Sequence, residues 1–174
     1  MTLKETTEIF SVLMLAYPNA EMFKGGMQKL GPTIKLWTQC LGDVDFWTAQ
    51  QAVIKLCKVC KFPPTIAELR EQVDNVNAEI ESSINDCIQL IRMWEHFGDL
   101  EEHIAQLPKG DILAIVVARL GGVPGLTETH EHNGETFSMW RWEEFRKQYR
   151  NAVKTNVLPG GSFRALPGAI QERT

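Results

Sequence analysis

The chain of 174 residues has 44% hydrophobic and 23% charged residues, which is typical of a soluble globular protein. Its longest nearly apolar run, Ile112 to Leu120, is far shorter than the ~20 residues of a membrane-spanning helix. The charged start also lacks the apolar segment of a secretory signal, so we expect a cytoplasmic protein without a membrane span. The net charge is −4, and residues 65–107 hold most of the acidic excess, which disfavours wrapping of DNA over the whole surface and leaves only local nucleic-acid contact open.

Hydrophobic periodicity predicts three helices in the first third of the chain. Residues 3–17 carry a wide apolar face, and Pro18 ends the pattern. After a glycine-containing connection, residues 32–41 form a second helix with proline in its first turn. Asp45 is a good N-cap for a third helix over residues 46–60, whose apolar residues recur at steps of three or four.

A longer helical region follows. Thr65 and Glu68 form a capping box, which places a helix start near residue 66. Residues 66–97 contain neither proline nor glycine, but Asn75-Val76-Asn77 is a weak point for a helix. We therefore expect two helices here, or one kinked helix.

The remaining segments complete an all-α prediction. A short helix follows Asp99 and ends near residue 107, and the apolar segment 112–120 is a helix for which a strand is the alternative. Residues 121–134 are predicted to form a loop and residues 135–155 the last helix. The fold class is thus one or more small multi-helix domains with a flexible C-terminal tail. The expected divisions are residues 1–75, an additional helical region 76–155 with a basic aromatic last helix, and the tail 156–174.

No constellation of residues points to catalysis. The glycine pairs lack the Lys-Ser/Thr that a phosphate-binding loop needs. Cys57 and Cys60 have a metal-like spacing, but no second ligand pair accompanies them, and His130 and His132 lie in a polar loop. We expect no enzyme, no cofactor and no metal site.

The predicted last helix, residues 135–155, offers a candidate partner surface. Its core stripe leaves out Trp140, which falls on the opposite side near basic side chains, although packing of Trp140 against Phe137 and the preceding loop is an equal alternative. The partner of such a surface is an acidic protein patch or a nucleic-acid single strand. Apolar residues scattered through the tail are candidate anchors that order on binding. The candidate partner-binding residues are Trp140, Lys147, Arg150, Lys154, Leu158, Phe163 and Leu166.

The first third of the chain resembles the amino-terminal domain of replicative helicase loader and inhibitor proteins of phages and prophages of Gram-positive bacteria. The resemblance covers about residues 5–75. The residues that carry it are Ala16-Tyr17-Pro18-Asn19, Trp37, Leu41-x-Asp43-x-Asp45-Phe46, Ala49-x-x-Ala52-Val53 and, most specifically, Lys61-Phe62-Pro63-Pro64-Thr65-Ile66-Ala67-Glu68.

This resemblance implies a small, helical, non-catalytic protein of the bacterial host cytoplasm. Such a protein binds the DnaB-type replicative helicase hexamer, restrains it and delivers it to an origin bound by the phage initiator. The family associates helicase contact with the carboxy-terminal segment and initiator contact with the folded amino-terminal part. Two other classes stay open: a DNA-binding phage replication initiator, and a helical phage assembly or structural protein.

The Phe62-Pro63-Pro64 corner is expected to be structural. Consecutive prolines forbid a helix and set the angle between the third and fourth helices. We predict that the Phe62 ring is buried and plugs this junction.

Overall fold

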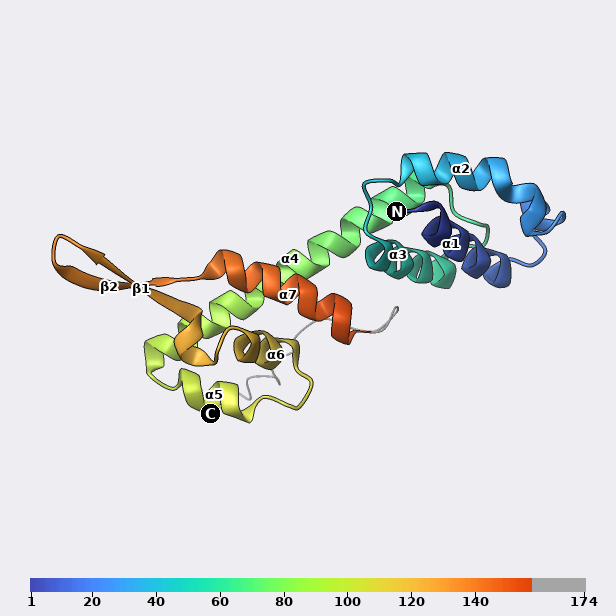
Figure 1. Ribbon diagram of the computed structural model, residues 1–174. Coiled ribbons are helices and arrows are strands. Elements are labelled where there is room, and N and C mark those ends of the chain that lie inside the picture. Colours follow the sequence, from blue (N-terminus) through green and yellow to red (C-terminus); the bar gives the residue numbers. More distant parts are fainter. Residues whose placement is uncertain (158–174) are drawn as a thin grey trace. The chain divides into compact units, whose positions relative to one another are not determined.

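The computed structural model describes residues 1–157, and the predicted tail of residues 156–174 falls almost wholly outside them. The described residues are mainly helical, with one two-stranded sheet (Figure 1). The chain divides into two compact units, Met1–Ala78 and the part from Glu79 onward. Helix α4, Ile66–Phe97, contributes residues to both units.

The first unit contains the three predicted helices and the start of α4. The helices are α1, Leu3–Ala16, α2, Gly31–Cys40, and α3, Phe46–Val59, and two 3₁₀ turns, Glu21–Phe23 and Met27–Leu30, fill the predicted connection. The predicted caps are present: the Asp45 carboxylate accepts a hydrogen bond from the Thr48 amide at 3.1 Å. In the capping box at α4, the Thr65 hydroxyl accepts from the Glu68 amide at 3.2 Å, and the Glu68 carboxylate accepts from the Thr65 amide at 2.7 Å.

The core of the first unit lies between α1, α2 and α3. Helix α1 packs on both of the others, and the Phe10 and Trp37 rings meet edge to face with their centroids 5.0 Å apart. The predicted apolar stripes supply this core, whose buried side chains include Ile9, Phe10, Leu13, Ile34, Trp37, Ala49, Val53, Leu56 and Leu69.

Helix α4 is a single helix rather than two, because the weak segment at Asn75 does not interrupt it. Val76, between the two asparagines, is fully buried. A poor helix former costs at most about 0.7 kcal/mol, whereas burying a valine side chain contributes about 1.5 kcal/mol or more, so packing overrides propensity here.

The second unit packs three further helices on the later part of α4. These are α5, Leu100–Gln106, α6, Ile112–Arg119, and α7, Trp142–Asn156. The apolar segment after Asp111 is a helix, as favoured, and the Asp111 carboxylate caps it by accepting from the Leu113 and Ala114 amides. Buried side chains of this unit include Ile84, Cys87, Ile91, Leu113, Val116, Val117, Leu126, Phe145, Tyr149 and Val153.

A β-hairpin corrects the all-α prediction. Strands β1, Thr127–His132, and β2, Glu135–Trp140, pair antiparallel where a loop and the start of the last helix were expected. The turn consists of Asn133 and Gly134, with φ values of 53° and 81°. Positive φ at both central residues is the requirement of a type I′ turn, for which Asn-Gly is the strongest local signal. The fold is therefore mainly, but not purely, α.

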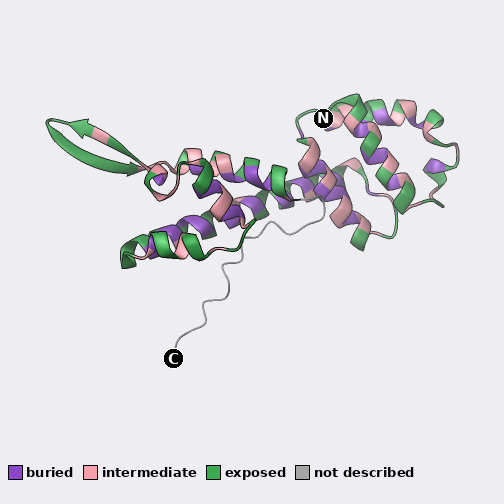
Figure 2. Ribbon diagram, turned by 60° about the horizontal axis from the view of Figure 1, so that its bottom comes forward, coloured by how far each residue is buried: buried purple, intermediate pink, exposed green. Residues whose placement is uncertain are grey.

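Figure 1 shows the hairpin projecting away from the helices of its unit, and Figure 2 shows both of its strands largely exposed. Helix α7 consequently begins at Trp142, seven residues after the predicted start at residue 135.

Candidate partner-binding surfaces

Trp140 does not lie on the last helix. It is the final residue of β2, and its ring stacks on that of Trp142 with centroids 4.6 Å apart and planes 7° apart. The guanidinium of Arg92 lies 5.4 Å from the Trp142 ring centroid. The predicted placement of Trp140 on a helical face beside Lys147 and Lys154 is therefore wrong, because the strand continues through residue 140. What the structure offers instead is a half-buried pair of stacked indoles at the base of the hairpin.

The predicted core stripe of the last helix is present from Trp142 onward. Phe145, Tyr149 and Val153 are buried. Burial raises the pKa of the neighbouring Cys87 thiol to about 12 although Tyr149 forms a hydrogen bond with it. This face of α7 serves the core and carries no partner contact.

Acidic side chains accompany the basic residues of α7. Arg150 lies 2.7 Å from the Glu81 carboxylate and Arg146 lies 3.2 Å from the same group. Lys147 lies 3.7 Å from Glu144. The pKa of Glu144 is lowered chiefly by a hydrogen bond from Gln148 and further by Lys147. The cationic face predicted for an acidic partner is thus largely compensated within the unit.

The remaining predicted residues are placed as follows. Lys154 is exposed near the end of α7. Leu158, Phe163 and Leu166 lie outside the described residues. The structure therefore brings no more than Lys147, Arg150 and Lys154 of the predicted set onto one element.

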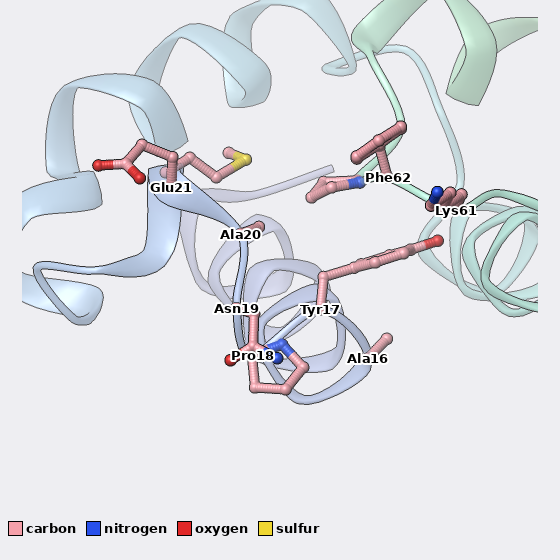
Figure 3. A pocket seen from close by; sticks show the side chains of 10 residues that line it. Ala16, Tyr17, Pro18, Asn19, Ala20, Glu21, Lys61 and Phe62 are labelled. Carbon is pink, nitrogen blue, oxygen red and sulfur yellow. The ribbon is translucent and has the colours of Figure 1, made fainter.

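A second surface lies on the first unit, at the end of α1. A groove of about 650 Å³ runs between residues 16–22 and residues 61–63. Figure 3 shows Ala16 to Glu21 on one side of it and Lys61 and Phe62 on the other. These are two of the strings on which the family resemblance rests, so the fold brings together residues that are more than forty positions apart.

Phe62 is exposed at this groove, and its predicted burial is wrong. Its exposed fraction is 71%, and the Lys61 ammonium lies 5.7 Å from its ring centroid. Helix α3 ends at Val59 and the chain bends at residues 61–62, which turns the ring outward, while Pro64 is buried at the junction instead. An exposed phenylalanine beside an apolar hollow is a feature of protein-binding surfaces.

Several contacts fix the two walls of the groove. The Tyr17 hydroxyl donates to the Cys60 carbonyl at 3.2 Å and so joins the end of α1 to the end of α3. Burial, with the neighbouring Cys57, raises the pKa of Tyr17 to about 12, so the phenol keeps its proton for this bond at neutral pH. The groove is therefore a preformed feature of the first unit.

The corner after the groove is anchored by Arg70. Its guanidinium binds both oxygens of Asp43, at 3.0 and 2.8 Å, and also donates to the Cys40 carbonyl. This hydrogen bonding lowers the pKa of Asp43. The start of α4 is thereby tied to the loop between α2 and α3.

Nothing in the described part of the chain gathers three or more metal-binding side chains. Cys57 is half-buried and its pKa is raised by that burial, which lowers its capacity to supply a thiolate ligand. Among residues 1–157, none of the helices combines the length and apolarity needed to span a bilayer.

Comparison with known proteins gives one finding. Residues 1–70 match a family model that describes the N-terminal domain of a phage helicase loader/inhibitor. The resemblance inferred from the sequence is confirmed over this domain, which contains the whole groove. No curated protein and no solved structure matches the chain.

Proposed function

We propose, because residues 1–70 belong to the N-terminal domain family of a phage helicase loader/inhibitor, that this protein binds the replicative helicase hexamer of its bacterial host. It restrains the DnaB-type helicase and delivers it to an origin bound by the phage initiator. It acts in the host cytoplasm, without catalysis of its own and without a cofactor. The domain match is the observation that carries this proposal.

The charge of the second unit favours a protein partner over DNA. Residues 98–141, which comprise α5, α6 and the hairpin, contain seven acidic residues and three basic ones. A DNA-reading element needs a basic surface, so a DNA-binding initiator is the weaker candidate. An assembly protein is disfavoured by the domain match.

The direct test is capture of the host helicase by the purified full chain, with and without ATP, followed by an unwinding assay. We expect a stable complex and a lowered unwinding rate. A helicase that neither binds nor slows at saturating protein would contradict the proposal.

Helicase binding is expected to need Trp140 and residues 156–174. Trp140→Ala removes a half-buried ring from a rigid stack, which at a central anchor costs about 2 kcal/mol, or roughly a thirtyfold rise in Kd. Deletion of residues 156–174 is expected to weaken binding while the Tm stays within about a degree, because no core residue is removed. Trp140→Phe keeps a stacking ring and serves as the control. Wild-type affinity in both the truncation and Trp140→Ala would place the contact elsewhere.

The groove of the first unit is proposed as the initiator-binding surface. Phe62→Ala is expected to weaken initiator binding by about 1–2 kcal/mol, since the ring is available to a partner and not to the core. Leu15→Ala is a matched control, because Leu15 is also exposed, at 81%, and is not among the groove residues. Titration of the initiator and the helicase against both variants checks the assignment. Loss of helicase binding alone in Phe62→Ala would reverse the division of labour.

A further inference from the structure

The β-hairpin is a two-stranded sheet with two free edges. Within the described residues no third strand pairs with it. Phe137 and Met139 are 44% and 50% exposed on β2, and Figures 1 and 2 show the hairpin standing clear of the helices. A two-stranded hairpin is marginally stable in water and gains from a further strand.

The register shows which backbone groups of β2 face outward. Thr127 pairs with Trp140 and His132 with Glu135. The Arg141 amide donates to the Leu126 carbonyl at 2.9 Å, which makes residues 126 and 141 a hydrogen-bonded pair. Because such pairs alternate along an antiparallel ladder, the odd-numbered residues of β2 bond to β1. The amides and carbonyls of Thr136, Ser138 and Trp140 therefore point to the free edge.

The two edges differ in how they are protected. β1 carries Glu128 and Glu131, whereas residues 136–140 of β2 contain no charge and no proline. Proteins protect exposed edges with charged residues, prolines and bulges, and an unprotected, partly apolar edge is a template for another strand. The free edge of β2 is thus open to strand addition.

We propose that a second copy of this chain pairs its β2 strand antiparallel with this edge, centred on Ser138 facing Ser138 of the other copy. This centre matches the outward backbone groups, because Ser138 pairs with itself and Thr136 pairs with Trp140. In that register Phe137 of each copy lies opposite Met139 of the other, so four exposed apolar side chains share one face. Glu135 lies opposite Arg141, which brings opposite charges together at both ends.

The charge match supports a second copy over an unrelated strand. Self-pairing places no like charges opposite each other between residues 135 and 141, whereas like-charged opposite pairs oppose sheet formation. The joined hairpins form a four-stranded sheet with a small contact area. Association is therefore weak, with a Kd of about 10–500 μM.

The first experiment uses the full chain without any partner, so it is independent of the helicase proposal. Sedimentation velocity over a concentration series to about 1 mM is expected to show a reversible monomer–dimer equilibrium. Amide hydrogen exchange measured at low and high concentration is expected to gain protection at Thr136, Ser138 and Trp140. The amides of Phe137 and Met139 bond to β1 at both concentrations. A chain that remains monomeric over the whole series, or protection that does not depend on concentration, would overturn the proposal.

The second experiment uses a matched pair of prolines. Ser138→Pro removes an outward amide of β2, and Thr129→Pro removes the outward amide of its cross-strand partner on β1. Neither amide bonds within the hairpin, so both variants keep its internal ladder. Ser138→Pro is expected to raise the dimer Kd about tenfold or more, and Thr129→Pro to leave it unchanged. Equal effects of the two variants, or a dimer that survives Ser138→Pro, would show that the β2 edge is not the interface.

Discussion

Phe10→Ala is expected to lower the free energy of unfolding of the first unit by about 3–5 kcal/mol. Phe10 is fully buried between α1 and α2, and its ring packs edge to face on Trp37. Truncation removes the transfer free energy of the ring and leaves a cavity that the surrounding helices fill only in part. Hydrogen exchange of the full chain, followed separately for peptides from residues 1–65 and 100–157, measures the loss in each unit.

Phe62→Ala is the matched control for this prediction, because the same ring is removed from an exposed position. Surface substitutions of this kind change stability by about 0.5 kcal/mol or less. Protection of peptides from residues 1–65 should fall in Phe10→Ala and stay at the wild-type level in Phe62→Ala. A large loss of stability in Phe62→Ala would show that its ring packs at the junction after all and would remove the groove as a preformed binding surface.

The first unit was predictable because its signals are local. Thr65 and Glu68 are three residues apart, and the apolar stripes of α1 and α3 recur at helical spacing, so each helix and its caps are encoded within one segment. The position of Phe62 was not predictable in this way. Whether a ring beside two prolines turns inward depends on the bend at residues 61–62 and on Pro64, which takes the buried position.

The hairpin was missed although its turn signal is present. Asn133-Gly134 is the preferred pair for a type I′ turn, but the flanking segments contain Glu128, Glu131 and Glu135 and bury little, so they show no clear alternation of apolar and polar residues. The aromatic residues after the turn matched a helical stripe when extended backward from Trp142. That extension placed Trp140 on the wrong kind of element.

The compensated charge of α7 could not be derived from sequence. Glu81 is 65 and 69 positions before its two arginine partners, and they meet only when α7 packs beside α4. Sequence reasoning found the basic residues of α7 but not their acidic partner. Charge counted along one helix is therefore an unreliable guide to a binding surface when a neighbouring helix is acidic.

Val116→Asp is expected to unfold the second unit or to destabilise it by at least about 4 kcal/mol. Val116 is fully buried in α6, a helix that packs against α7 and contributes much of the core of this unit. No cationic side chain is present in α6 before Arg119, so a carboxylate at residue 116 loses its hydration without gaining a partner on its own helix. Circular dichroism and hydrogen exchange of peptides from residues 100–157 measure the effect.

Ala118→Asp provides the matched control, because residue 118 is exposed on the same helix. A carboxylate near a helix C-terminus opposes the helix dipole and costs only about 0.3–1 kcal/mol. The two variants have the same charge and lie two residues apart, so the difference between them isolates burial. If Val116→Asp and Ala118→Asp unfold at the same denaturant concentration, α6 does not hold the core of the second unit. The stacked Trp140–Trp142 pair and the hairpin would then lack the rigid support on which their proposed binding roles depend.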